Sequence, residues 1–425
     1  MRMNGKCEHT AKVTAQAMRA FGLGFCMLLA ISPRIFAQTA PSASQPTVQT
    51  GSSRPHSTTA LKTRYTLDVA VYQNRVQPVL EKFAREQKLP GATLSFVLDD
   101  GRVGSVAVGV SHKADYRPMK PNDRMLAGSI GKTHVSAVAL LLMQEGRIAL
   151  DDKISTWFGK EDWFPRLPNA EQITLRMLMN HTSGIPEHVM MPEFLVAVRK
   201  DVERVWRPEE LITYVLDKPP LFPAGQGWSY ADTNYILVGM IIERVTGRAY
   251  YDELRERILR PLKLNDTLPS DQRILPGLIS GYTGPQNPFP VPEEVSVDGR
   301  CAFHPQMEWT GGGLLSNSAD LAQWAKQLYG GDMLHDSTKT LLLQGVKAET
   351  RLGPGHSYGL GVIIRHIDRG PAYGHAGWFP GYISIMDYYP ELDLAIAFQT
   401  NTDVGVHSPI VETLLDEVAK AVTAP

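Results

Sequence analysis

Runs typical of β-strands lie at the two ends of this 425-residue chain, and helices and loops fill the stretch between them. Near the amino end, apolar runs at 92–98 and 103–108 are joined by Asp99-Asp100-Gly101, a good hairpin turn because glycine adopts positive φ without steric cost. The last hundred residues contain three further strand candidates, at 357–366, 381–389 and 392–399. Strands from both ends predict one antiparallel sheet flanked by helices, an α+β fold with a mostly helical lobe inserted between the two groups.

Four segments have the apolar periodicity of amphipathic helices. They cover 76–83, 135–144, 235–245 and 410–421. The second and third are followed by Gly146 and Gly247, as expected for helices that end in a left-handed cap.

The first 37 residues have the features of a secretory signal peptide. Lysines and arginines precede an apolar run at 21–31, which is too short to span a bilayer, and a cleavage point follows Ala37. An uncleaved membrane anchor is the alternative. Residues 38–64 are rich in Ser, Thr, Pro and Gln, which is typical of a flexible linker. We therefore expect an exported protein, periplasmic or secreted, with one folded domain over 65–425.

Composition limits the partners and cofactors that this chain could use. The formal net charge of −1 gives no reason to expect nucleic acid as a partner, and a membrane partner is expected only if the signal is uncleaved. Cleavage would remove Cys7 and Cys26 and leave Cys301 alone, so neither an internal disulfide nor a cysteine cluster for metal is expected. The sequence also lacks a His-Glu-x-x-His motif. We expect no metal and no cofactor.

The stretch LAGSIGKTHV, residues 126–135, allows two interpretations. Its Gly-Lys-Thr could end a phosphate-binding loop, but Leu126 stands where that loop needs its first glycine, and no buried strand precedes it. The stretch also places Lys132 three residues after Ser129. If Ser129 opens a helix, both side chains share one face at the helix N-terminus, where developing negative charge is favoured. Alone, this pair could equally be a capping serine with an exposed lysine.

A second serine motif is rejected on its context. Residues 355–359, Gly-His-Ser-Tyr-Gly, match the nucleophile elbow of α/β-hydrolases, which needs a buried strand before it and a helix after it. Here a polar, proline-containing loop precedes the motif and an apolar strand candidate follows it. We therefore do not expect Ser357 to be a nucleophile.

Further stretches give the Ser129–Lys132 pair a specific meaning. Tyr230-Ala231-Asp232 lies inside FPAGQGWSYADTNY, His375-Ala376-Gly377 inside YGHAGWFPG, and 178–184 and 309–316 read LMNHTSG and WTGGGLLS. In order and spacing, these motifs resemble the serine penicillin-recognising family from about residue 70 to the carboxyl end. The nearest groups are class C β-lactamases, D-alanyl-D-alanine carboxypeptidases and related esterases.

The resemblance implies a role for each motif. Ser129 is the acylated nucleophile, Lys132 its partner and Tyr230 the general base. A tyrosine of pKa about 10 needs nearby cations to act as a base at neutral pH, so Lys132, assisted by His375, is expected to stabilise the phenolate. His375-Ala376-Gly377 would form the sheet edge beside the serine, and the backbone N–H groups of Ser129 and Trp378 would form an oxyanion hole.

Departures from the family pattern concern the substrate. Asp232 replaces the usual asparagine: it keeps an acceptor, loses the amide donor and should hold Lys132 protonated, which fits tyrosine as the base. Ala376 supplies no hydroxyl to grip a substrate carboxylate, and Trp378 is bulky and apolar. With His375 and Gly377, these residues form the expected substrate-binding set. They argue against efficient penicillin hydrolysis and favour an ester or a D-amino-acid amide.

The sequence thus predicts an exported serine hydrolase that works through an acyl-enzyme. The first expectation is a D-alanyl-D-alanine carboxypeptidase-like or D-amino-acid peptidase activity, with a small molecule or a peptidoglycan stem peptide as substrate. A carboxylic-ester hydrolase of the same fold is the alternative, followed by a class C-like β-lactamase. In a different class, the chain would be a non-catalytic peptidoglycan-binding or scaffold protein. The residues of His-Thr-Ser-Gly, including His181, are expected to shape a loop.

Overall fold

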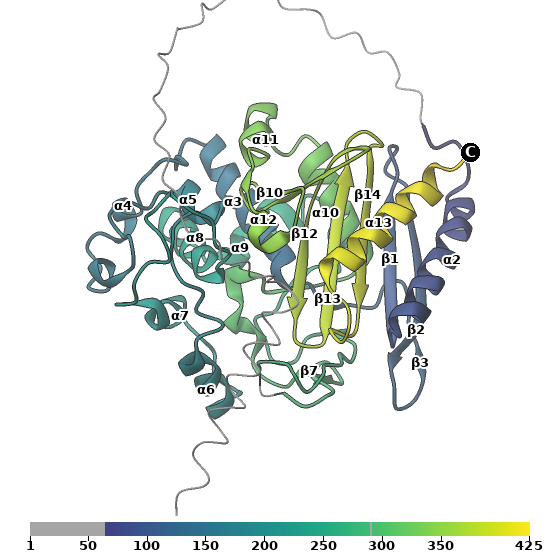
Figure 1. Ribbon diagram of the computed structural model, residues 1–425, viewed down its shortest axis with the longest axis horizontal. Coiled ribbons are helices and arrows are strands. Elements are labelled where there is room, and N and C mark those ends of the chain that lie inside the picture. Colours follow the sequence, from purple (N-terminus) through teal and green to yellow (C-terminus); the bar gives the residue numbers. More distant parts are fainter. Residues whose placement is uncertain (1–63, 290) are drawn as a thin grey trace, which may run out of the picture. The chain divides into compact units, whose positions relative to one another are not determined.

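A nine-stranded antiparallel sheet built from both ends of the chain organises the fold (Figure 1). Its strand order is β3-β2-β1-β14-β13-β12-β11-β10-β9. In chain order the strands are β1 (Gly91–Val97), β2 (Val103–His112), β3 (Arg117–Pro118), β9 (Val346–Lys347), β10 (His356–Tyr358), β11 (Ile363–Ile367), β12 (Gly370–Phe379), β13 (Tyr382–Tyr389) and β14 (Leu394–Thr400). The first and last strands of this set, β1 and β14, pair along their length, with Ala92 opposite Thr400. The predicted α+β fold is confirmed.

The computed structural model describes residues 64–289 and 291–425, and residues from Leu67 onward form one compact unit. The predicted signal peptide and all but the last residue of the predicted linker lie outside the described residues.

One predicted strand, 357–366, is in fact two. The chain leaves β10 after Tyr358 and turns back into β11 at Ile363, and the two strands pair as neighbours. Gly361 makes this turn with a φ of +79°, and a Cβ there would overlap the hydroxyl of Ser136. A continuous apolar run concealed the turn, because only the glycine conformation separates its two halves.

Helices lie on both faces of the large sheet. The main helices around it are α2 (Val69–Gln87), α10 (Ser318–Ala325) and α13 (Ser408–Thr423). Phe83 of α2 packs edge-on against Phe398 of β14. On β1, Ser95 bonds to Ser318 of α10 across 2.8 Å, and its cross-strand partner is Ala397, the neighbour of Phe398. Because successive strand residues face opposite sides, α2 and α10 cover opposite faces, and α13 packs with α2 (Figure 1).

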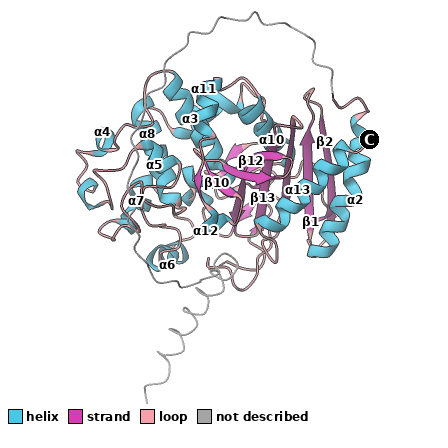
Figure 2. Ribbon diagram, turned by 45° about the horizontal axis from the view of Figure 1, so that its top comes forward, coloured by secondary structure: helices cyan, strands magenta, loops and turns pink. Residues whose placement is uncertain are grey.

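The middle of the chain forms the predicted helical lobe (Figure 2). Its helices are α3 (Gly131–Gln144), α4 (Ser155–Phe158), α5 (Leu175–Met179), α6 (Pro192–Lys200), α7 (Pro208–Ile212), α8 (Asp232–Thr246), α9 (Tyr250–Leu254), α11 (Asp336–Leu342) and α12 (Glu349–Leu352). The short strands β4 (Met125–Leu126), β5 (Leu268–Pro269) and β8 (Leu314–Ser316) form one small sheet, and β6 (Ser296–Val297) and β7 (Arg300–Cys301) another. Gly247 ends α8 with a φ of 71°, as its position predicted.

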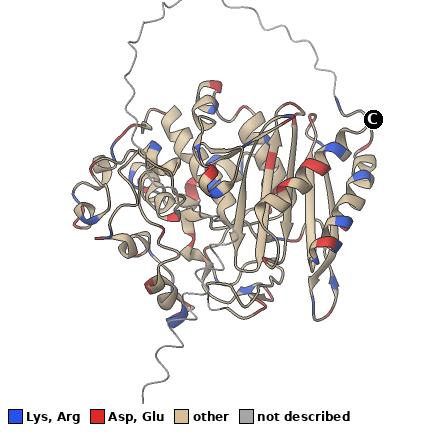
Figure 3. Cartoon of the chain, in the orientation of Figure 1, with Lys and Arg blue, Asp and Glu red and all other residues tan. Residues whose placement is uncertain are grey.

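Charged side chains lie mainly on helices and loops, with both signs interspersed (Figure 3). An exception crosses the sheet: Arg365 of β11, which is buried, donates to Asp387 of β13 at 2.6 Å and to Asp416 of α13 at 3.0 Å. This network links the closing helix to the sheet. Within residues 64–289 and 291–425, no helix combines the length and apolar character needed to cross a bilayer.

Candidate active site

Ser129 lies in a short 3-10 turn, η1 (Gly128–Ile130), that leads directly into α3. The α-helix therefore begins at Gly131, two residues later than if Ser129 itself opened it. Gly128 has a φ of +53°, and a Cβ on it would lie 2.6–2.8 Å from the backbone of Trp378. A larger residue at 128 would push this turn away from β12, so glycine sets the close approach that brings the serine to the sheet.

Lys132 lies at the centre of the site, fully buried. Its Nζ donates to Ser129 Oγ at 3.1 Å, to Asp232 Oδ1 at 2.5 Å and to the carbonyl of Gly311. Burial alone would lower the pKa of Lys132, but the charge of Asp232, followed by Tyr230, outweighs it and raises that pKa. Lys132 is therefore an ammonium group at neutral pH and cannot be the base that takes the serine proton.

Tyr230 faces the same ammonium group, with Lys132 Nζ 4.8 Å from the centre of its ring. Its hydroxyl is buried and makes no hydrogen bond of good geometry, although Lys132 and Ser129 are near enough to lower its pKa. Burial is the larger effect and raises the pKa of Tyr230 to about 12. The expectation that cations make this tyrosine acidic is thus only half right: the cation is present, but burial outweighs it.

Two carboxyl groups near Lys132 were not predicted: Glu187, which is partly buried, and Glu308, which is buried. Glu187 accepts the backbone N–H of Asp232 at 2.7 Å, and burial and the Asp232 charge raise its pKa to about 7. Burial and Asp232 also raise the pKa of Glu308 to about 8, and its Oε2 is buried without a hydrogen-bond partner. Each glutamate stands next to a motif that the sequence did single out, His-Thr-Ser-Gly at 181–184 and the glycine run at 311–313. The position of each glutamate next to a recognised motif was the feature of the sequence that could have indicated it.

His181 positions the segment that carries Tyr230 and Asp232. Its Nδ1 accepts the N–H of Ala231 at 3.3 Å and the amide of Asn234 at 3.0 Å, and its ring lies 4.2 Å from that of Tyr230. Burial, with the nearby charge of Lys132, lowers its pKa well below the ordinary value, so the ring is neutral. This agrees with the prediction that His181 shapes a loop.

His375 is buried and does not supply a second positive charge. Its Nε2 pairs with the hydroxyl of Tyr358 at 2.9 Å and its Nδ1 with the carbonyl of Ala376 at 2.6 Å. Burial, and then the charge of Lys132, lowers the pKa of His375 to about 3. The expectation that His375 assists as a cation is therefore wrong, because its burial could not be read from the sequence.

The third motif lies in a part of β12 that pairs with a strand on one side. β11 accompanies β12 only as far as Gly374, so residues 375–379 have β13 as their one strand neighbour. Phe379 and Tyr382 lie opposite each other with two residues between them, and in a two-residue hairpin the pair that flanks the loop is the hydrogen-bonded kind. The alternation of an antiparallel ladder then turns the N–H of Trp378 away from β13. Trp378 N would lie 2.7 Å from a Cβ on Gly128, so this N–H is next to the turn that carries Ser129.

An arginine at the entrance was also missed. Arg351 of α12 is exposed; it donates from Nη1 to the carbonyl of Tyr230 at 3.1 Å, and its guanidinium lies 5.0 Å from the centre of the Tyr230 ring. Nothing in its local sequence distinguishes it from other surface arginines, since the fold alone brings α12 to Tyr230. The described residues contain no group of three or more His, Cys, Asp or Glu side chains placed to hold a metal ion.

The antiparallel sheet with its inserted lobe and the grouped Ser129, Lys132 and Tyr230 define a serine hydrolase of the β-lactamase and D,D-peptidase fold. The chain matches the Beta-lactamase family over residues 75–420 and belongs to that family.

Relatives and solved structures of this family have several activities. Penicillin-binding protein 4* of Bacillus subtilis (strain 168) is 24% identical over 307 residues, 69% of this chain and 64% of the relative. The chain thus spans less than two thirds of that relative's length. Esterase EstB of Burkholderia gladioli is 26% identical, covering 84% of this chain and 97% of the esterase. The structure of D-amino acid amidase from Ochrobactrum anthropi SV3 complexed with D-phenylalanine has 25% identity and a TM-score of 0.72, covering 83% of this chain and 98% of the amidase.

Proposed function

We propose that this chain is an exported serine hydrolase that forms an acyl-enzyme at Ser129 and acts on amides or peptides of D-amino acids. The observation that carries the proposal is the position of Lys132 Nζ, 3.1 Å from Ser129 Oγ, 2.5 Å from Asp232 Oδ1 and 4.8 Å from the Tyr230 ring centre. A nucleophile, a fixed ammonium group and a tyrosine therefore meet in one partly buried site.

The mechanism uses the phenolate of Tyr230 as the base. Ser129 Oγ forms a bond to the substrate carbonyl carbon while its proton passes to the phenolate, and the ammonium group of Lys132 stabilises the charge on both oxygens. The N–H groups of Ser129 and Trp378 stabilise the oxyanion. Tyr230 then returns the proton to the leaving nitrogen as the carbon–nitrogen bond breaks, and it activates the water that hydrolyses the ester at Ser129.

The charges around the site favour a substrate with a free amino group. Asp232 and Glu187 are partly exposed carboxyl groups, and Glu187 accepts the backbone N–H of Asp232 at 2.7 Å. Asp232 is already paired with Lys132 at 2.5 Å, so the negative charge that Glu187 gains as it ionises near pH 7 is the one that attracts an ammonium group and repels the carboxylate that penicillins carry. Ala376 supplies no hydroxyl to hold a carboxylate. The amide of a D-amino acid fits these charges, and the similar amidase from Ochrobactrum anthropi SV3 supports the stereochemistry.

A second candidate, D-alanyl-D-alanine carboxypeptidase-like activity on peptidoglycan stem peptides, is favoured by Arg351. This exposed guanidinium stands over Tyr230 and could pair with a C-terminal carboxylate. Ester hydrolysis remains the next alternative, supported by the likeness to EstB.

Hydrolysis of D-phenylalanine amide, its L-enantiomer, a D-alanyl-D-alanine peptide, a short-chain nitrophenyl ester and a cephalosporin tests the proposal, with Ser129→Ala as the control. We expect the D-amide or the D,D-peptide to be hydrolysed by the wild type and not by Ser129→Ala. Turnover of the ester alone makes the protein an esterase, and turnover of the cephalosporin alone makes it a β-lactamase. If no substrate turns over, the non-catalytic scaffold hypothesis takes precedence.

Export is tested separately by the amino-terminal sequence of the protein in a host that secretes it. We expect the mature chain to begin after Ala37. A chain that keeps residues 1–37 and stays with the membrane contradicts cleavage.

A further inference from the structure

One carboxylate oxygen ties together three segments next to the site. Asp403 lies in the loop that follows β14, and its Oδ2 accepts four hydrogen bonds. The donors are Trp378 Nε1 at 3.0 Å, Gly381 N at 3.2 Å, Thr283 Oγ1 at 3.1 Å and Asn287 Nδ2 at 3.1 Å. Trp378 and Gly381 belong to the hairpin end of β12 and β13, whereas Thr283 and Asn287 belong to the long loop before β6.

The indole of Trp378 is held from a second side by aromatic packing. Its ring lies 6.1 Å from that of Phe289, which is buried and stacks on Phe303 at 5.3 Å. Phe289 follows Asn287 in the same loop, and its N–H donates to Asn287 Oδ1 at 2.9 Å. The hydrogen bond from Asn287 to Asp403 therefore also fixes the loop that packs against the indole.

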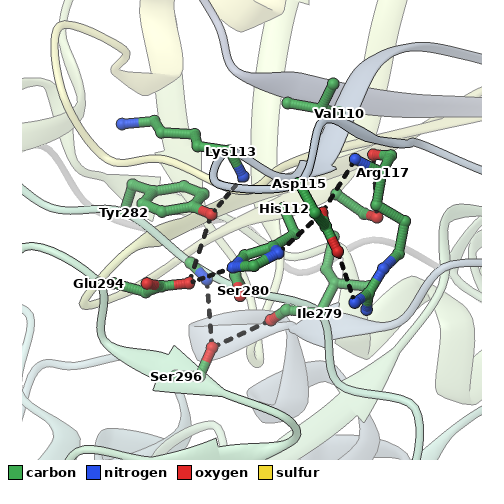
Figure 4. Close-up of polar contacts among 12 residues, drawn as sticks. Val110, His112, Lys113, Asp115, Arg117, Ile279, Ser280, Tyr282, Glu294 and Ser296 are labelled. Carbon is green, nitrogen blue, oxygen red and sulfur yellow. Dashed lines mark hydrogen bonds and ion pairs between the residues drawn. The ribbon is translucent and has the colours of Figure 1, made fainter.

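The base of this loop is anchored to the far end of β2 (Figure 4). The backbone N–H of Lys113 donates to the Tyr282 hydroxyl at 2.8 Å, and that hydroxyl donates to Glu294 at 3.4 Å. His112 joins the same carboxylate, with its Nε2 3.4 Å from Glu294 Oε1. Tyr282 also exchanges backbone hydrogen bonds with the loop of Asp403: its N–H donates to Asn401, and the Asp403 N–H donates to Tyr282. The loop that carries Asp403 is therefore held in place by its backbone hydrogen bonds to Tyr282.

We propose that Asp403 is a positioning residue that holds the backbone N–H of Trp378 in place as the oxyanion donor opposite Ser129. The proposal rests on the function proposed above. At the hairpin end of β12, the indole of Trp378 and the amide of Gly381 both donate to the same Asp403 oxygen. Beyond Gly374 β13 is the one strand that pairs with this segment, and Asp403 adds a restraint on it through the Trp378 side chain and the Gly381 amide. Oxyanion stabilisation depends on such preorganisation.

The test measures kcat for ester hydrolysis, divided by the fraction of molecules whose Ser129 can react. Purified full-length variants are labelled with a fluorophosphonate, the labelled fraction of Ser129 is counted by intact-protein mass spectrometry, and kcat is divided by that fraction. This correction separates a slower site from a smaller number of folded molecules. Asp403→Ala removes all four bonds, and Trp378→Phe removes only the indole N–H. Thr283→Val removes the bond to Asp403 and the one that Thr283 accepts from Asn287 at 2.7 Å, neither of which reaches the hairpin.

We expect Asp403→Ala to lower kcat per labelled serine about 10-fold with KM unchanged, a fraction of the roughly 10²–10³-fold loss that removal of an oxyanion donor causes. Trp378→Phe should lower it in the same direction, and the double variant should be no slower than Asp403→Ala alone. Thr283→Val should stay within about 2-fold of the wild type.

The inference is overturned if Asp403→Ala and Trp378→Phe both keep the wild-type kcat per labelled serine, or if only KM changes. It is equally overturned if the two losses simply multiply in the double variant. A wild-type protein that is neither labelled nor active refutes the proposed function first, and this inference with it.

Discussion

Replacing Asp232 with asparagine should move the pH dependence of hydrolysis to lower pH. Asp232 Oδ1 lies 2.5 Å from Lys132 Nζ, and its charge raises the pKa of both Lys132 and Tyr230. Two unit charges about 4 Å apart interact by roughly 4 kcal/mol at an effective dielectric constant of about 20. At about 1.4 kcal/mol for each tenfold change, this corresponds to roughly three pH units for the directly paired lysine.

The consequence for the reaction follows from the base. In the wild type, with the Tyr230 pKa at about 12, the phenolate increases about tenfold with each pH unit through the neutral range, so kcat/KM should rise with pH. In Asp232→Asn the Tyr230 pKa falls. We expect the rising limb of kcat/KM against pH to shift by about 1 to 3 pH units to lower pH, so that the variant reaches a given kcat/KM at lower pH than the wild type.

The assay is kcat/KM for a short-chain nitrophenyl ester between pH 5 and 11, corrected for spontaneous hydrolysis. Asp217→Asn is the control, because Asp217 is an exposed carboxylate paired with Arg166 on the surface. In the wild type, ionisation of Glu187 and Glu308 near pH 7 and 8 adds negative charge and opposes the rise; in Asp232→Asn, which lacks the Asp232 charge, both groups ionise at lower pH. An unmoved profile, or one displaced to higher pH, refutes the assignment of Tyr230 and Lys132 as a coupled pair.

Three further predictions concern stability and close packing. Burial gives Glu308 a folded pKa of about 8, above its ordinary value, so its contribution to stability is complete below about pH 4 and is lost as pH rises to 8. In a thermal scan, Glu308→Gln should raise Tm at pH 8 and leave it unchanged at pH 4. Gly128→Ala should lower kcat by at least about 10²-fold, because the added methyl group displaces the Trp378 N–H, while circular dichroism shows a folded protein. Near-normal turnover contradicts the close approach of Gly128 to the Trp378 backbone. Arg365→Met leaves the buried Asp387 unpaired and should lower the free energy of unfolding, measured in urea, by about 3–5 kcal/mol. A loss below about 1 kcal/mol contradicts this.

Much of the fold could be predicted because its signals are local. Periodicity and turn residues indicated the strands at both ends and a helix over 135–144, which in the structure begins at Gly131. The pairing of β1 with β14 confirms the sheet that they predicted. The motifs also named Ser129, Lys132, Tyr230 and Asp232, which the structure brings together.

The rest depended on burial and on long-range packing. Whether His375 carries a charge is decided by desolvation inside the fold, and no local pattern records it. Arg351 and Asp403 come from segments far from the serine in sequence, and each gains its place only when its loop packs beside the site. Glu187 and Glu308 lie next to recognised motifs, so the residues that flank these motifs were candidates for the site.

The covalent intermediate at Ser129 is the central claim, and a rapid acid quench with mass spectrometry tests it most directly. Wild-type protein and Ser129→Ala are mixed with a nitrophenyl ester, quenched within milliseconds, digested and mapped. The account predicts one acyl group on the peptide that carries Ser129 in the wild type, decaying as product forms, and no acyl group in the variant. An acyl group on another residue, or turnover that persists in Ser129→Ala, would contradict it.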